Sequence, residues 1–584
     1  MIPILIIDLL PLGSEAACDC GSTDANTPCT GLSIFVSVTA GTPNNGIAVN
    51  SEYTWAFHSG GGDARCGQFA NGDYWVAPAA GQTSVTIASI TSNGSVSADV
   101  DPIPESMGLM SGSKNYGNYN SAENIIPKLP MSFSTTSSIV AAVQRNESIE
   151  GNCGTSAIVG ACIDSYNVVT ILSSVPDDAG AHSIRPNITG QTKKMLKLSD
   201  FDLSKIPGKN FLVGPTTAKL EDIRKRWSHS TEIFGVFNSV IASGWSEGGR
   251  AFRSHTLIDD YGAGAGVAFS NDLMHLFSND LSLDAKTQAL AAMLTYGQDT
   301  FNAVYNPPAG VTRWFGVGAS QSSGRFLPAV LFAALLRNST QKDLIKKAGV
   351  EGQDRASVGP HELTQIHQGK NNRVVWGDVI YGDQEEAAYW GNLFISQCYD
   401  GATGTCTTTN GKRTGRDPHG YIDGPPNKPG AGYLTSTLGP QRALLATMFL
   451  IPDVCEAVNS QMLIDYIDRT NKSGLITIDD PCVTPDKRES VTDCTPYPSG
   501  AGCKYYKVTW GPDPANPGDC LKAPTPPYTK VGRFTALNGN SIGVAYPTSQ
   551  VESNWESIRG SSPICQLSVP IPSNFIVSPT KISN

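Results

Sequence analysis

Two arginines and a tryptophan stand in one glycine-rich segment of the chain. The segment GVTRWFGVGASQSSGR contains Arg313, Trp314 and Arg325. A guanidinium pairs with a carboxylate through two parallel N–H groups, and an indole ring offers a flat apolar face on which a sugar ring can stack. We therefore predict that Arg313 and Trp314 bind substrate and that Arg325 acts on its carboxylate during catalysis.

Histidine and tyrosine side chains that could transfer protons occur elsewhere in the chain. His419 and Tyr421 lie in DPHGYIDG, a loop rich in glycine and proline, and His367 ends HELTQIH. In β-elimination of a uronate-containing polymer, Arg or His neutralises the carboxylate and acidifies the neighbouring carbon-bound proton; Tyr or His removes that proton, and Tyr protonates the leaving oxygen. We predict Tyr421 with His367 or His419 for these steps, and Tyr261 and Asp299 as substrate contacts.

Carboxylates support a second reaction, glycoside hydrolysis, in which two acidic groups flank the bond that breaks. Asp299 with Glu385 or Glu386 is the pair that the sequence offers. A structural role is the competing interpretation of Asp299, because Tyr296 and Asp299 in TYGQD could brace the end of a helix.

Other classes of site lack their motifs. His367 follows His361 by six residues, whereas two zinc ligands on one helical face need a spacing of about four. The chain has no G-x-S-x-G nucleophile elbow, P-loop or dinucleotide-binding glycine pattern. No metal ligand set and no cofactor are predicted, and a structural calcium ion is left open.

Helical hairpins are expected to position the polar loops. Residues 281–305 place apolar side chains on one face, and residues 323–338 are apolar nearly all round, as in a buried helix. Further helical patterns between 221 and 475 predict an (α/α) toroid, whose loops would surround one central cleft.

The regions on either side of this helical domain have β character. Residues 30–190 alternate apolar and polar positions between turn residues, which predicts a β-sandwich. Its aromatic residues Trp55, Tyr74 and Trp75 are predicted to be core, with a sugar-stacking platform as the alternative. Residues 476–584 predict a small disulfide-rich segment of β-strands and loops.

Composition favours an exported protein. The 14 cysteines lack C-x-x-C spacings, which favours disulfide bonds in an oxidising compartment. Residues 1–17 predict an export signal, although Asp8 interrupts it and no Lys or Arg precedes Arg65. A net charge of -10 argues against nucleic acid as a partner, and no later segment predicts a membrane span. The predicted location is secreted, periplasmic or cell-surface.

Several motifs occur in an order that resembles a known group of proteins. They are, in sequence order, GDYWVAP, LPMSFSTTSSIVAAV, VVTILSSVP with SIRPNITG, LTYGQD, GASQSSGRFLPAVLFAALL and DYIDR. Over residues 65–470 the chain is similar to large secreted bacterial proteins of unsettled activity. The resemblance implies an N-terminal β-sandwich and a toroid-like helical domain similar to that of polysaccharide lyases.

Taken together, these patterns predict a multidomain α+β protein that depolymerises an extracellular, acidic polysaccharide by β-elimination. The alternatives are a glycoside hydrolase on the same scaffold and a non-catalytic surface or filament protein that binds glycan. The sequence does not determine the oligomeric state.

Overall fold

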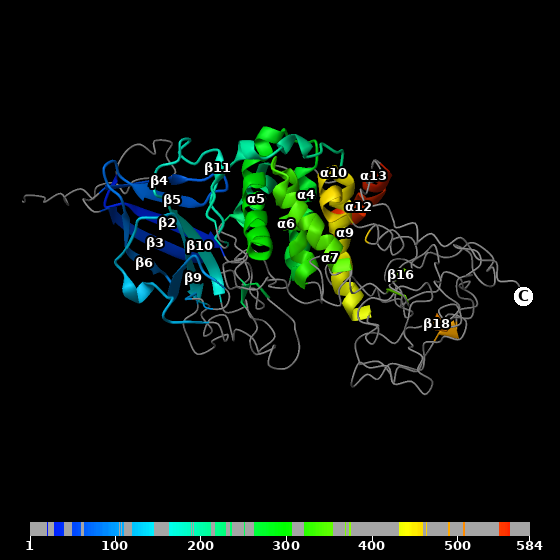
Figure 1. Ribbon diagram of the computed structural model, residues 1–584, viewed down its shortest axis with the longest axis horizontal. Helices are drawn as coiled ribbons and strands as arrows, with labels where there is room; N and C mark the ends of the chain where they lie inside the picture. The colour runs from blue at the N-terminus through cyan, green and yellow to red at the C-terminus, as the bar shows by residue number, and fades with distance from the viewer. Residues whose placement is uncertain are drawn as a thin grey trace, which may run out of the picture.

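Sheets and helices occupy different parts of the computed structural model (Figure 1). This arrangement confirms the combination of α and β structure predicted from the sequence. The residues that the structure describes are 20, 29–39, 50–59, 63–103, 106, 108–109, 119–144, 163–188, 190, 192–211, 217–228, 234–235, 250–251, 262–306, 321–353, 368–369, 373–374, 431–459, 463, 489–490, 506–507 and 548–560.

The larger sheet has six strands, of which β5 and β10 run parallel and the other neighbours antiparallel. The longest pairing joins β9 to β10, with Tyr166 opposite Ala142. In spatial order the strands are β1 (Cys29–Thr30), β4 (Asp63–Gln68), β5 (Tyr74–Pro78), β10 (Ile163–Ile171), β9 (Ser137–Gln144) and β7 (Val96–Val100).

The smaller sheet is antiparallel and shares a hydrophobic core with the larger one. Along β2 the apolar side chains Ile34, Val36 and Val38 are buried while Phe35 is exposed, as the period of two predicts. Tyr53 also crosses between the sheets, since its hydroxyl donates to the carbonyl of Ser165 at 2.9 Å. The strands in spatial order are β2 (Ser33–Thr39), β3 (Asn50–Ser59), β6 (Val85–Ser92) and β8 (Met131–Phe133).

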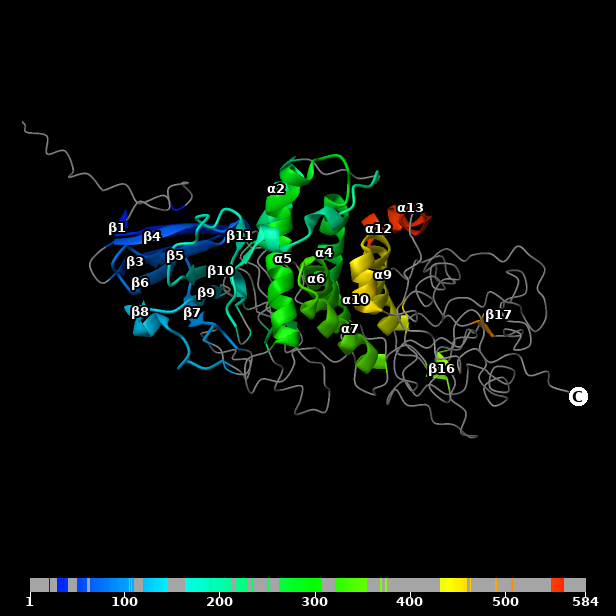
Figure 2. The same cartoon turned by 45° about the horizontal axis from the view of Figure 1, so that its top comes forward.

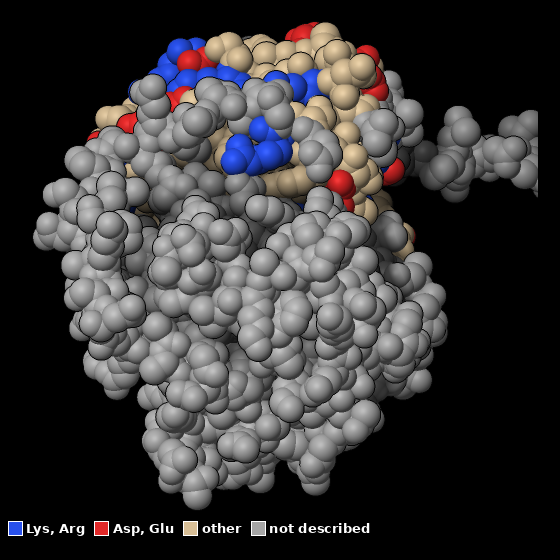
Figure 3. Space-filling model, turned by 90° about the vertical axis from the view of Figure 1, so that its right-hand side faces the viewer, with Lys and Arg blue, Asp and Glu red and all other residues tan. Residues whose placement is uncertain are grey.

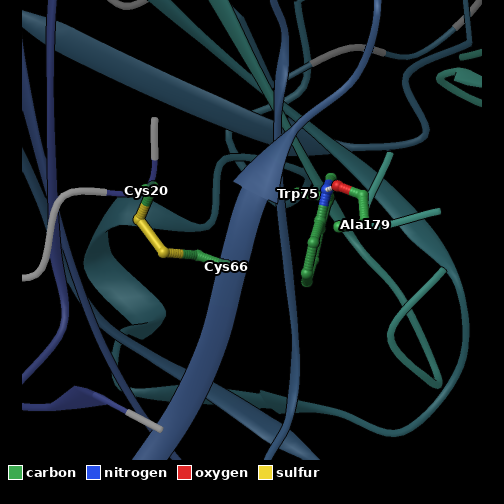
Figure 4. The surroundings of a disulfide bond; sticks show 4 residues. All are labelled: Cys20, Cys66, Trp75 and Ala179. Carbon is green, nitrogen blue, oxygen red and sulfur yellow. Dashed lines mark hydrogen bonds between the residues drawn. A yellow bond between two sulfur atoms is a disulfide. The ribbon is translucent and has the colours of Figure 1, made fainter. Parts of the chain in front are cut away.

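Tryptophan side chains lie inside this β region. Trp55 and Trp75 are fully buried, so the core interpretation is confirmed for these two residues, whereas Tyr74 is half-buried and packs against the core. Figure 4 shows Trp75 donating through its indole Nε1 to the carbonyl of Ala179, at 3.0 Å. Nearby, a disulfide bond joins Cys20 to Cys66 in β4.

Helices packed side by side form the second large core. In Figures 1 and 2, α5 stands next to the sheets, and α4, α6 and α9 follow. The helices are α2 (Thr217–Trp227), α4 (Gly262–Leu276), α5 (Leu283–Tyr305), α6 (Gln321–Leu335), α7 (Thr340–Gln353), α9 (Ala431–Leu450), α10 (Pro452–Val458), α12 (Ser549–Ser553) and α13 (Trp555–Gly560). The short elements are η1 (Ile126–Lys128), η3 (Leu198–Asp200), η4 (Leu203–Lys205), β11 (Ser183–Ile184), β12 (Leu196–Lys197), β13 (Phe234–Gly235), β14 (Arg250–Ala251), β15 (Gln368–Gly369), β16 (Arg373–Val374), β17 (Glu489–Ser490) and β18 (Tyr506–Lys507).

Glycine allows α4 and α6 to approach at backbone distance. A Cβ atom on Gly324 would lie 1.7 Å from the carbonyl oxygen of Gly262, and one on Gly266 would lie 2.4 Å from the carbonyl oxygen of Gly324. Pro328 lacks an amide hydrogen, so the carbonyl of Gly324 has no helical partner four residues later. The same turn of α6 therefore combines the loss of one helical hydrogen bond with a close helix crossing.

The two helices predicted at 281–305 and 323–338 are present as α5 and α6. The expected β and loop segment 476–584 also contains helix, since α12 and α13 pack against α9. Val551, Trp555 and Ile558 in these helices are buried in the helical core. Their spacings of four and three residues are helical, and each helix is too short to show as a long periodic pattern.

Between 354 and 430 the structure describes only 368–369 and 373–374, so a closed toroid stays a prediction.

Candidate functional site

Two of the eight predicted site residues, Asp299 and Arg325, belong to the described part of the chain. Asp299 lies in α5 and Arg325 in the first turns of α6. The other six lie outside the described residues; they are Tyr261, Arg313, Trp314, His367, His419 and Tyr421.

Asp299 belongs to a buried ion pair with Arg185, which follows strand β11. The guanidinium donates to both carboxylate oxygens, from Nη1 at 3.1 Å and from Nη2 at 2.5 Å. The amide of Ile188 donates to the first of these oxygens at 2.9 Å. Both charged side chains are fully buried. Because a substrate cannot reach a carboxylate in this position, the bracing interpretation of Asp299 fits the geometry and a direct substrate contact does not.

Arg185 also binds Asp73, from the turn between β4 and β5. Its Nε donates to Oδ2 of Asp73 at 2.6 Å, and the side-chain amide of Asn71 donates to the same oxygen at 2.7 Å. Burial alone lowers the pKa of Arg185, but the carboxylates of Asp299 and Asp73 outweigh it and raise that pKa. We call Asp73, Arg185 and Asp299 the Arg185 network; it joins the larger sheet to helix α5, which lie side by side in Figures 1 and 2.

Lys193 adds a second connection beside this network. Its ammonium lies 2.5 Å from the Asp101 carboxylate, just after β7, and donates to the carbonyl of Asn187 at 2.8 Å. Burial lowers the pKa of Lys193, and the attraction of Asp101 opposes that shift. The segment that carries Arg185 is thus attached to the sheet at two places.

Helix α2 contacts both the sheet region and the helical region. The hydroxyl of Ser228, at its C-terminal end, donates to the carbonyl of Asn71 at 2.6 Å. On its other side, Arg226 and the indole of Trp227 donate to one oxygen of Asp272 in α4, at 2.6 Å and 2.9 Å. Arg226 is therefore held in an ion pair with a buried carboxylate. His275, one turn beyond Asp272, is buried, and burial lowers its pKa.

Arg325 is buried, with 1% of its surface exposed. It follows Gly324, where α6 meets α4. In this arrangement a polymer in solvent does not reach the guanidinium. Both described site residues are thus buried, Asp299 at the junction between the larger sheet and α5 and Arg325 where α6 meets α4.

Arg185 and Asp73 were not among the residues predicted to form a site, although three of the quoted motifs contain the Arg185 network. GDYWVAP supplies Asp73, SIRPNITG supplies Arg185 and LTYGQD supplies Asp299. The signal in the sequence was the presence of one basic and two acidic residues in these motifs. Their spacing along the chain does not show that the three side chains are buried together.

Neither a metal-ligand group nor a membrane-spanning helix is present among the described residues. Among them, no group of three or more His, Cys, Asp or Glu side chains is arranged to hold a metal ion. None of the described helices has the length and apolar composition that a membrane span requires.

Comparisons with known proteins gave no relative. No protein-family model matches the chain, and neither the curated proteins nor the solved structures include a significant match.

Proposed function

We propose that the chain is a secreted protein in which a β-sandwich and an (α/α) toroid act together to bind and depolymerise an acidic polysaccharide by β-elimination. The shared core of the two sheets supports the sandwich. The Cys20–Cys66 disulfide bond supports export, because disulfides persist in oxidising compartments.

The place where α5 ends is the observation that carries this proposal. That connection, residues 307–320, contains Arg313 and Trp314 and starts from Asn306 at the end of α5. A Cβ atom on Gly190 would lie 3.1 Å from the carbonyl oxygen of Asn306. Asn306 therefore lies beside the segment that the Arg185 network fixes, and a fixed base of this kind suits substrate-binding residues that follow it in the chain.

In the proposed reaction Arg313 pairs with the uronate carboxylate and Trp314 stacks on a sugar ring. Tyr421 with His367 or His419 transfers the protons. Figure 3 shows both basic and acidic side chains on the described surface facing the viewer. Recognition of an acidic polymer in this proposal thus depends on particular arginines and not on a uniformly basic face.

Glycan binding without catalysis is the second candidate. The burial of Asp299 and Arg325 favours it, because neither side chain is available to a substrate in this arrangement. Hydrolysis through Asp299 would likewise require the Arg185 ion pair to open.

The test is a screen of acidic polysaccharides with the full chain. New ultraviolet absorbance from an unsaturated uronate supports elimination. New reducing ends without that absorbance indicate a hydrolase, and retention of polymer without cleavage indicates binding only. A chain that neither cleaves nor retains any of the polymers refutes the proposal.

Substitution then tests the loop. Arg313→Ala and Trp314→Ala should each reduce cleavage or retention at least tenfold. The matched control is Lys225→Ala, which removes a basic side chain that is 66% exposed on α2. Equal losses in the control would mean that general charge, and not this loop, binds the polymer.

A further inference from the structure

We propose that Asn338 is a site of N-linked glycosylation. The chain has five N-x-S/T sequences, of which the structure describes those at Asn93, Asn187 and Asn338. The environments of these three asparagines differ, and the differences select one of them.

Asn338 stands at the corner between α6 and α7, where residues 337–340 are all exposed. Its side-chain oxygen accepts a hydrogen bond from the amide of Thr340 at 3.0 Å. This Asx turn fixes the plane of the side-chain amide. Its nitrogen, Nδ2, has no hydrogen-bond partner among the described residues and is available for modification.

The backbone on both sides of this corner is held in place. The amide of Arg337 donates to the carbonyl of Asp200 at 2.9 Å, and the amide of Asp343 donates to the carbonyl of Ser339 at 2.9 Å. The acceptor is therefore a well-supported exposed turn, and a glycan there would extend into solvent without displacing a packed side chain.

The other two asparagines use their side chains in the fold. Asn93 is exposed, but its Nδ2 donates to the carbonyl of Asn50 at 2.8 Å and its oxygen accepts from the amide of Glu52 at 3.0 Å. Asn187 is 2% exposed and lies beside Gln298 of α5. A glycan on Asn187 would have no space in the folded protein, since the junction with the helices surrounds it.

The reaction requires a lipid-linked diphosphate oligosaccharide and an oligosaccharyltransferase. Nδ2 of Asn338 attacks the anomeric carbon of the donor, a carbon–nitrogen bond forms, the carbon–oxygen bond to the diphosphate breaks and Nδ2 loses a proton. The hydroxyl of the third residue, Thr340, completes the acceptor sequence.

The experiment is secretion of the full chain from a eukaryotic host behind a heterologous export signal. Glycopeptides are then mapped by mass spectrometry after enzymatic removal of glycans in heavy-oxygen water. In the folded, secreted protein we expect a glycan at Asn338 and none at Asn93 or Asn187. The result does not depend on any polysaccharide activity, so it is separate from the proposed function.

Three variants make the test specific. Asn338→Gln and Thr340→Ala should abolish the modification, whereas Thr340→Ser should retain it. Thr340→Ala keeps the backbone amide that binds Asn338, so it removes the acceptor hydroxyl with little change to the turn. An unmodified Asn338 in wild-type protein, from cells whose own secreted glycoproteins are fully modified, overturns the proposal, as does a glycan on Asn187 in the folded protein.

Discussion

Replacement of Asp299 by Asn should destabilise the protein strongly, although the two side chains have nearly the same shape. The carboxylate accepts two hydrogen bonds from Arg185 and one from the amide of Ile188. An Asn side chain can keep the bond from Ile188, but its NH₂ group would face an N–H of Arg185. At least one charge-assisted bond is lost, at about 1.5–3 kcal/mol, while the ion pair between the guanidinium and Asp73 remains.

Loss of one partner from a buried ion pair costs about 3–5 kcal/mol. Because the free energy of unfolding of native proteins is about 5–15 kcal/mol, Asp299→Asn should remove about a fifth of the stability or more. The assay is urea unfolding followed by circular dichroism, with Asp222→Asn, an exposed aspartate of α2, as the control. A double-mutant cycle with Arg185→Gln should give a double variant less destabilised than the sum of the singles. An unchanged midpoint for Asp299→Asn, or penalties that simply add, would refute the reasoning.

Three further perturbations test other contacts. Gly324→Ala gains about 1 kcal/mol of helix propensity, but its Cβ would meet the carbonyl oxygen of Gly262 at 1.7 Å. Because overpacking costs about 1–3 kcal/mol or more, the variant should unfold at a lower temperature. An unchanged or raised melting temperature would contradict the close crossing of α4 and α6. Burial raises the pKa of Asp99 from 3.8 to about 7, so its contribution to stability is complete below about pH 4 and is lost as pH rises through about 7. In Asp99→Asn the urea midpoint should fall less as pH rises through about 7 than it does in the wild type. The same pH dependence in both proteins would contradict the raised pKa of Asp99. Burial lowers the pKa of His275 below 6.5, so the contribution of His275 to stability is present above that pH and is lost as pH falls through the folded pKa. His275→Gln should therefore make the free energy of unfolding less sensitive to acid. Equal acid sensitivity of the variant and the wild type would contradict this prediction.

Local patterns were sufficient to predict many elements of this fold. The alternation of Ile34, Val36 and Val38 predicted a strand with one buried face, and the apolar face of 281–305 predicted α5, because both signals come from neighbours in the sequence. The two short helices near the C-terminus were missed, since the contact of Trp555 with α9 depends on tertiary packing.

The candidate site was harder to predict because charge type does not determine burial. Asp299 was singled out as a polar residue near a helix end, with bracing as the alternative, and the structure places it against Arg185, which is 114 residues away in sequence. The sequence around each residue does not distinguish a buried ion pair from a contact with substrate. The predictions for Tyr261, Arg313, Trp314, His367, His419 and Tyr421 concern residues outside the described part and stay predictions.

The Arg185 network limits how this gene can recombine. Asp73 and Arg185 are encoded in the first third of the chain, whereas Asp299 comes from the helical half. A crossover between codons 190 and 280 that imported a foreign helical half would bury a guanidinium against whatever residue replaced Asp299. Chimaeras that transplant all three residues together should be recovered in soluble form, whereas those that separate the arginine from the second aspartate should be lost to misfolding.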